Sequence, residues 1–116
     1  MREIIFYKTT GGKSPISDFL DTLSAKQAKK VAWVLNIIEE LEIIPGQYFK
    51  KLVNTDDIWE VRVKIGSNIF RLLGFFDGSK VVVLSHAFQK KTQKTPRQAI
   101  QLAEKRKGDY FRRKRK

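Results

Sequence analysis

Charged side chains interrupt apolar patterns at three places in the second half of the chain. Glu60, Arg62 and Lys64 alternate with apolar residues, Arg71 stands inside an apolar run, and His86 lies near the end of another. Gathered arginines can stabilise the negative charge of a phosphorane-like transition state, and an imidazole can transfer protons near neutral pH. If the fold brings them together, these residues predict cleavage of RNA by attack of its own 2′-hydroxyl on the adjacent phosphate.

Each of these residues also has a structural interpretation. Arg71 can be a structural arginine that pairs with Glu60. Arg62 and Lys64 can form a solvated sheet face, and a lone His86 at a strand end can serve packing alone. The alternation along the chain does not decide between these interpretations.

The formal net charge of +12, from 24 Lys and Arg against 12 Asp and Glu, is concentrated at one end of the chain. Residues 86–116 hold 12 basic and 2 acidic side chains, a net charge of +10. Because each cation placed on a phosphate releases a counterion, this asymmetry predicts a polyanionic partner, either nucleic acid or an acidic protein. We expect Lys64, on the polar strand face, and Lys94, in this basic region, to bind RNA. The last basic run, 112–116, can alternatively be a solubilising tail.

The composition excludes several kinds of site. The chain has no cysteine and one histidine, which excludes disulfides, thiolate metal sites and histidine-rich metal sites. We therefore expect neither a metal nor a cofactor. No apolar stretch approaches the roughly 20 residues that span a bilayer, and residues 1–8 lack the apolar core of a signal peptide. We expect a cytoplasmic protein with no membrane partner.

The first half of the chain predicts elements that could support such a site. A short strand is expected at residues 4–7. Ser14-Pro15 starts one helix, and the capping box of Ser24 and Gln27 starts a second, longer helix. Apolar residues recur at helical spacing in both, and Pro45-Gly46 ends the second. We expect the two to form an N-terminal helical hairpin.

The second half of the chain predicts a sheet. Strands are expected around 49–53 and at 58–65, 69–76 and 80–88. Thr95-Pro96 would start a last helix, with a second capping box to Gln98, and Gly108 would end it.

Together these elements predict an α+β fold. A twisted, mostly antiparallel sheet would carry the helical hairpin on one face and leave the other as an open basic concavity, with a helix at the C-terminus. A single domain at 1–109 would precede a basic tail at 110–116.

Three segments, in this order, resemble the RelE/ParE superfamily of toxins, most closely its phage-derived HigB-like branch. They are Trp59-Glu60-Val61-Arg62, Phe70-Arg71 and His86-Ala87-Phe88-Gln89-Lys90-Lys91-Thr92. The resemblance covers residues 1 to about 109. It implies a RelE-like fold and the toxin of a type II toxin–antitoxin system, a metal-independent, ribosome-dependent messenger-RNA endoribonuclease that inhibits translation. The partners it implies are a helix-turn-helix, HigA-like antitoxin, the ribosome and messenger RNA.

The resemblance also implies roles for the strand residues. Arg71 matches the arginine that typically contacts the scissile phosphate. Glu60 and Arg62 match polar positions of the preceding strand, where relatives place basic or acid–base groups. We therefore expect Glu60, Arg62 and Arg71 to be catalytic together with His86.

Further roles are implied downstream of these strands. Lys90 and Lys91 match a basic pair that is expected to hold RNA or to supply charge to the transition state. His86 is the best candidate for proton transfer, although some relatives place a histidine or tyrosine at the extreme C-terminus. This chain ends there in Arg-Arg-Lys-Arg-Lys, with Tyr110 as the nearest tyrosine.

Two other functions fit the same residues. A ParE-like toxin poisons DNA gyrase on the same fold and needs no phosphate-binding cluster. A non-catalytic nucleic-acid-binding module would bind RNA or DNA without cutting it. Loss of messenger RNA on induction, without DNA-damage signalling, would distinguish the ribonuclease from the gyrase poison.

Overall fold

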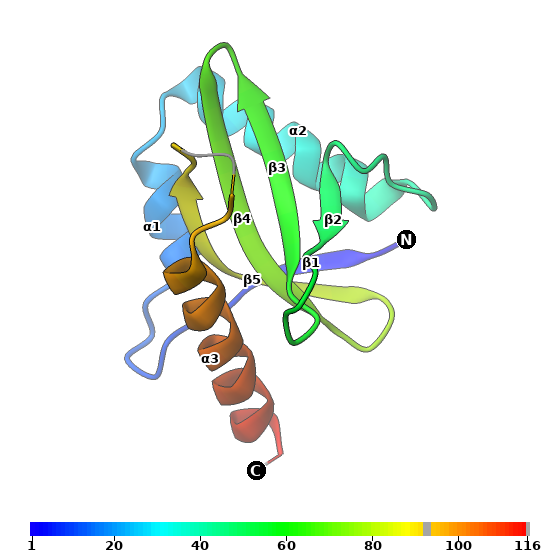
Figure 1. Ribbon diagram of the computed structural model, residues 1–116, viewed down its shortest axis with the longest axis vertical. Coiled ribbons are helices and arrows are strands. Elements are labelled where there is room, and N and C mark those ends of the chain that lie inside the picture. Colours follow the sequence, from blue (N-terminus) through cyan, green and yellow to red (C-terminus); the bar gives the residue numbers. More distant parts are fainter. Residues whose placement is uncertain (92–93, 116) are drawn as a thin grey trace.

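The computed structural model describes residues 1–91 and 94–115. Thr92 and Lys116, which belong to segments singled out above, lie outside the described residues. The described part contains three helices and one five-stranded sheet (Figure 1). In chain order the elements are β1 (Glu3–Phe6), α1 (Pro15–Asp21), α2 (Ala25–Glu40), β2 (Phe49–Lys51), β3 (Trp59–Ile65), β4 (Asn68–Asp77), β5 (Val81–Gln89) and α3 (Arg97–Lys114). The predicted α+β class is confirmed.

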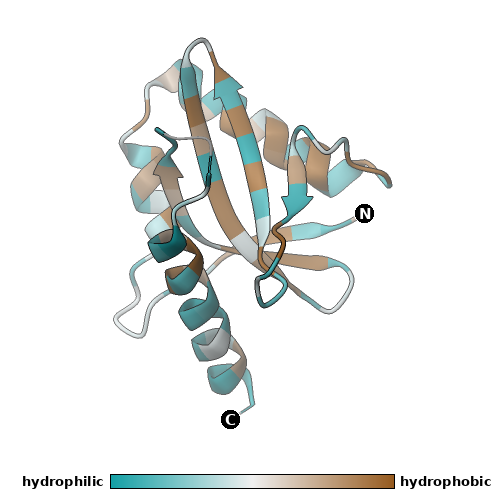
Figure 2. Cartoon of the chain, viewed as in Figure 1, coloured by the Kyte–Doolittle hydropathy of each residue, from teal (hydrophilic) through white to brown (hydrophobic). Residues whose placement is uncertain are grey.

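The sheet is mixed, with the strand order β1-β5-β4-β3-β2. Strands β2 to β5 pair antiparallel with their neighbours, and β1 pairs parallel with β5. The alternation in β3 divides the two faces as predicted: Val61 and Val63 are buried in the main core, while Arg62 and Lys64 lie on the opposite face. Figure 2 shows this alternation of hydrophilic and hydrophobic residues along β3.

The two first helices cover one face of the sheet, but the expected N-terminal hairpin is wrong. The expected first strand, β1, precedes both helices, but α1 packs mainly against β5 whereas α2 packs mainly against β3. Each helix buries its own apolar residues in the sheet core, so neither needs the other as a packing partner. Their predicted starts are confirmed, because the side chains of Ser14 and Ser24 accept hydrogen bonds from the backbone amides of Ser17 and Gln27.

Helix α3 covers part of the other sheet face, so that face is not an entirely open concavity. Ala99 and Ala103 pack with Leu73 of β4. The prediction that Gly108 ends the helix is wrong. Tyr110 and Phe111 continue it and pack on Phe75 and its neighbours, and the segment expected as a tail is helical as far as Lys114. An interior glycine costs a helix only about 1 kcal/mol, which this aromatic burial outweighs.

The predicted capping box at the start of α3 is also wrong. The N-cap is Pro96, and no side chain caps the helix start. The hydroxyl of Thr95 instead donates a hydrogen bond to the carboxylate of Glu60. This is a charge-assisted hydrogen bond to a buried carboxylate, so the hydroxyl contributes to the tertiary fold and not to the helix cap.

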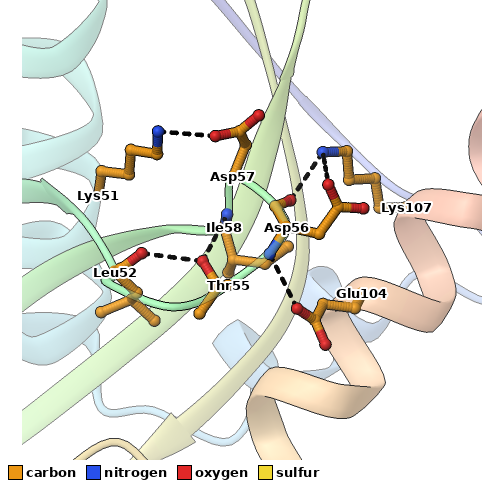
Figure 3. Close-up of polar contacts among 8 residues, drawn as sticks. All are labelled: Lys51, Leu52, Thr55, Asp56, Asp57, Ile58, Glu104 and Lys107. Carbon is orange, nitrogen blue, oxygen red and sulfur yellow. Dashed lines mark hydrogen bonds and ion pairs between the residues drawn. The ribbon is translucent and has the colours of Figure 1, made fainter.

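The turn between β2 and β3 is fastened to the middle of α3 (Figure 3). The Asp56 amide donates to Glu104 Oε2 at 2.9 Å, and Lys107 Nζ donates to the Asp56 carbonyl at 2.7 Å. Within the turn, the Thr55 hydroxyl accepts from the Ile58 amide at 3.1 Å. These contacts hold α3 beside the start of β3. No helix in the described part of the chain is long and apolar enough to cross a membrane.

Candidate functional site

A buried carboxylate lies at the centre of the candidate site. The side chain of Glu60 is 0% exposed, although it lies on the sheet face opposite the main core. Arg62 Nε donates a hydrogen bond to Glu60 Oε1 at 3.0 Å, and Arg71 Nε lies 3.3 Å from the same oxygen as an ion pair. Thr95 donates to the other carboxylate oxygen. A charge buried to this extent is tolerated because it is paired and hydrogen-bonded.

The strand register brings the two arginines together. Arg62 and Arg71 are direct partners across β3 and β4, where opposite residues have Cβ atoms about 4.5–5.5 Å apart. Two cations at that spacing repel each other, and Glu60 between them offsets the repulsion. The three side chains together carry a net charge of about +1.

The environment of Arg71 is tighter than that of Arg62. The side chain of Arg71 is 12% exposed and that of Arg62 is 31% exposed. Burial lowers the pKa of Arg71, Glu60 raises it and Arg62 lowers it further. Arg71 Nε is buried and makes no hydrogen bond within the described residues, because its contact with Glu60 is close but poorly aligned. Arg71 is thus a cation held in a partly desolvated position.

The arginine pair opens onto a groove of about 350 Å³, here called the basic groove. Besides Arg62 and Arg71 it is lined by Lys30, Gln47, Tyr48, Lys64 and Ile69. None of these lining residues is acidic. Both arginines direct Nε towards Glu60, and within the described part of the chain their terminal nitrogens make no hydrogen bond or ion pair. The four terminal nitrogens of the two guanidinium groups can therefore donate hydrogen bonds to a bound anion.

The lysines that follow β5 are placed differently from one another. The Lys90 amide donates to the Ile69 carbonyl at 2.7 Å and so extends the pairing of β5 with β4. Burial lowers the pKa of Lys90, and the positive charge of Arg71 lowers it further. Lys91 and Lys94 are exposed. Lys94 directly precedes Thr95 and so lies next to the residue that holds Glu60.

Residues 18–108 match a protein family described as phage-derived protein Gp49-like (DUF891). The chain belongs to the Gp49-like family. This is a phage-derived, toxin-like family related to RelE, which agrees with the resemblance of the strand motifs at that coarser level. The more specific HigB-like branch stays a prediction. A search of curated proteins finds no match to the chain.

The Gp49-like chain does not bring His86 into the arginine pair. In the pairing of β4 with β5, His86 lies opposite Leu73, whereas Phe88 lies opposite Arg71. The imidazole stacks on Phe88 with ring centroids 5.6 Å apart. Burial lowers its pKa and the charge of Arg106 lowers it further. His86 is therefore neutral near pH 7. Phe88, which lies opposite Arg71, stands between the imidazole and the arginine pair.

Sequence reasoning missed four residues of this Gp49-like site. Thr95 was expected only as a helix cap, and Lys30, Gln47 and Tyr48 were not singled out. Lys30 lies in α2, while Gln47 and Tyr48 lie in the loop before β2, so they reach the groove only through the tertiary fold. No local pattern marks them.

Proposed function

We propose that this Gp49-like protein is the toxin of a type II toxin–antitoxin system and an endoribonuclease that cuts messenger RNA on the ribosome. The observation that carries the proposal is the pair Arg62 and Arg71, which Glu60 holds beside a groove with no acidic lining residue. Membership of a toxin-like family supports the toxin part of the proposal.

The proposed reaction is an internal displacement at phosphorus. The 2′-oxygen of one nucleotide bonds to the adjacent phosphorus while the bond to the next nucleotide's 5′-oxygen breaks. The 2′-hydroxyl gives up its proton and the departing 5′-oxygen takes one up, so the products are a 2′,3′-cyclic phosphate and a free 5′-hydroxyl. Charge builds up on the non-bridging oxygens, and the terminal nitrogens of Arg62 and Arg71 would bind those oxygens. Losing one such preorganised donor typically lowers the rate by about 10²–10³.

The structure bears on how the four expected catalytic residues divide this work. Glu60 is fully buried and held by three side chains, which favours a role in positioning the arginines over a role in proton transfer. His86 is neutral near pH 7 and could accept a proton from the 2′-hydroxyl. Its contact with Phe88 separates it from the arginine pair, so this step requires the RNA to reach past Phe88.

The proposed partners follow from charge and family. A chain with a formal net charge of +12 would bind ribosomal RNA and messenger RNA through phosphate contacts. Lys64 lines the groove, and Lys90, Lys91 and Lys94 follow β5, where they would extend the same track. A toxin of this kind requires an antitoxin, for which a helix-turn-helix, HigA-like protein is proposed.

The test is brief induction in bacteria followed by primer extension on a reporter message. Wild-type protein is expected to give new 5′ ends and growth arrest. Arg71→Ala is expected to remove both, and Lys29→Ala, which removes an exposed cation from α2, should act like wild type. Supercoiling defects with DNA-damage signalling and intact messages would identify a gyrase poison instead.

A second variant keeps this test decisive if Arg71→Ala fails to fold. Removing Arg71 alone leaves Glu60 buried with one cation fewer, which is destabilising. The double variant Glu60→Gln/Arg71→Gln removes one charge of each sign and so leaves the local net charge unchanged. If the double variant folds and still cuts messages at the wild-type rate, the proposal is wrong.

A further inference from the structure

The basic groove has a second wall that the proposed chemistry does not use. Arg62, Lys64 and Arg71 line it from the strands, whereas Lys30, Gln47 and Tyr48 line it from α2 and the loop before β2. This second wall combines a cation, an amide and an aromatic ring. That combination is suited to a ligand with a charged part and a flat ring.

Tyr48 is held firmly at this wall. Its amide donates to the Pro45 carbonyl at 3.0 Å, and its carbonyl accepts from the Arg62 amide at 2.8 Å. This backbone bond joins the Tyr48 backbone to β3 at Arg62, and both residues line the basic groove. The ring of Trp33 meets the ring of Tyr48 edge-on, with centroids 5.6 Å apart and an interplanar angle of 85°. Tyr48 is thus fixed from both its backbone and its ring.

Trp33 does not line the groove, but it contacts two residues of this wall, Tyr48 and Lys30. Trp33 is 48% exposed, which is unusual for the largest aromatic side chain. Lys30 Nζ lies over the Trp33 ring, 4.5 Å from its centroid. This contact orders the side chain of Lys30, which lines the groove together with the strand arginines.

We propose that the basic groove is a single-nucleotide subsite for single-stranded RNA. Tyr48 stacks on the base whose phosphate lies on Arg62 and Arg71, and Lys30 contacts the neighbouring phosphate. The Gln47 amide lies where it can hydrogen-bond the edge of the stacked base. The inference rests on the proposed function, since it takes RNA as the ligand, and it adds which residues bind the base.

The observations favour RNA over an acidic protein segment. The carboxylates of an acidic peptide would pair with the cations of the groove but would not stack on an aromatic ring, whereas a nucleobase would. Proteins bind single-stranded RNA by stacking unpaired bases on aromatic side chains while cations follow the backbone. The volume of about 350 Å³ lies at the small end of the roughly 300–1,000 Å³ range of ligand pockets, which suits one nucleotide.

The experiment measures binding of a short, fluorescein-labelled 2′-O-methyl RNA to the full chain by anisotropy. This probe lacks the attacking hydroxyl, so it is bound without being cut. One base at a time is replaced by an abasic sugar. Wild-type protein is expected to lose roughly 5- to 150-fold in affinity at one position and little elsewhere, as for the loss of a single stacked base. An abasic scan with no sensitive position overturns the subsite.

Substitutions at Tyr48 tie the sensitive position to its ring. Tyr48→Phe keeps the ring and should bind like wild type, whereas Tyr48→Leu keeps apolar bulk without a π face. Tyr48→Leu should lose affinity for the intact probe and should no longer distinguish the abasic probes. Unchanged positional sensitivity in folded Tyr48→Leu would assign the stacking to another residue and contradict the proposal.

The fluorescence of wild-type protein provides a readout that needs no variant of Tyr48. Because Trp33 contacts Tyr48 and is half exposed, a base that stacks on Tyr48 should change the Trp33 emission. Trp33→Phe should remove this change. Emission that stays constant at saturating probe would count against the subsite even if Tyr48→Leu could not be purified.

Lys30 has a matched control one residue away. Lys29 is on the same helix but is exposed and does not line the groove. Lys30→Ala should lower the salt slope of probe binding by about one phosphate contact, and Lys29→Ala should leave it unchanged. Equal effects of the two variants would mean that the groove attracts RNA only through its general charge.

The subsite and the proposed function can fail separately. Binding with one abasic-sensitive position, but no cleavage of messages in bacteria, would leave the subsite and reject the ribonuclease. Cleavage of messages by a protein whose probe binding ignores the Tyr48 ring would leave the ribonuclease and reject the subsite.

Discussion

At the residue scale, Glu60 decides how the arginine pair is arranged. One carboxylate oxygen serves both Nε atoms of Arg62 and Arg71, and the other accepts from Thr95. Each guanidinium is thereby oriented through its inner nitrogen and keeps its outer nitrogens for a ligand. Glu60 is therefore a positioning residue in the proposed reaction.

Glu60→Ala should destabilise the fold and disorder the arginine pair. Losing a buried ion-pair partner costs about 3–5 kcal/mol, and we expect about 3 kcal/mol here because Arg62 is 31% exposed. Urea unfolding measures this cost, with Lys64→Ala as a surface control that should change the free energy of unfolding by less than about 0.5 kcal/mol. Glu60→Gln should lower the rate of cleavage without changing the shape of its pH profile. A lost limb of that profile would make Glu60 a general base.

His86 should make stability depend on pH between neutrality and mild acid. Burial and Arg106 lower its pKa in the folded chain below the usual 6.5. Above pH 6.5 the ring is neutral in both states; as the pH falls below 6.5, the unfolded chain takes up the proton first. The free energy of unfolding should therefore fall as the pH falls from about 6.5 towards the folded-state pKa. His86→Gln, which cannot be protonated, should flatten this part of the curve, and an unchanged slope would contradict the assigned burial.

Only some residues of this site could be predicted from the sequence. The alternation in β3 predicted that Glu60 and Arg62 share a face. The pairing of Arg71 with Glu60 was one of the two interpretations of Arg71 that the sequence left open. The role of Thr95 was not predictable, because its hydroxyl reaches Glu60 across 35 positions of sequence. Tyr48 and Lys30 were missed for the same reason, since only the packed fold brings them to the groove.

Among the helices and strands, short-range sequence signals predicted the strands and the helix starts well, but they predicted the end of α3 poorly. The capping box of Ser24 and Gln27 is a contact between near neighbours, so the sequence alone contains it. The end of α3 depends instead on Tyr110 and Phe111 meeting Phe75 in β4. The cost of Gly108 inside a helix is small, so the contacts of Tyr110 and Phe111 with Phe75 decide where α3 ends.

The two glycines Gly108 and Gly74 should respond oppositely to alanine. Gly108 is inside α3 with open space around an added Cβ, so Gly108→Ala should stabilise the fold by about 0.5–1 kcal/mol. Gly74 lies at the irregular pairing of β4 with β5, where an added Cβ would come within 2.2 Å of the Val83 carbonyl oxygen. Gly74→Ala should therefore be strongly destabilising. Thermal melting of both variants measures the contrast, and a stable Gly74→Ala protein would show that the strands can separate there.

At the scale of the whole molecule, the basic end of the chain is part of the fold. Tyr110 donates to Asp77 at 2.7 Å, and this bond together with burial raises the pKa of Tyr110 to about 12. Asp109 accepts from Tyr7 at 2.6 Å and pairs with Arg113. The last turns of α3 thus contact Asp77 at the end of β4 and Tyr7, the residue that follows β1.

Truncation and substitution should distinguish the contribution of residues 110–116 to stability from their contribution to RNA binding. Deleting residues 110–116 should lower the melting temperature markedly, because it removes the contacts of Tyr110 and Phe111 with Phe75. Replacing the exposed Arg112 and Arg115 by Ala should leave the melting temperature nearly unchanged and reduce the salt dependence of RNA binding. A truncated protein as stable as the full chain would make this segment a dispensable tail.

The hydrogen bond from Thr95 to Glu60 links the start of α3 to the arginine pair, and the turn in Figure 3 links its middle to the start of β3. If two ligands bind at sites coupled through such a link, each changes the affinity of the other by the same factor. An anion that tightens the arginines should raise the hydrogen-exchange protection of α3, and a protein that pulls α3 away should weaken anion binding by the same factor. An inhibitor of this molecule therefore does not have to cover the groove, since loosening one helix would be enough.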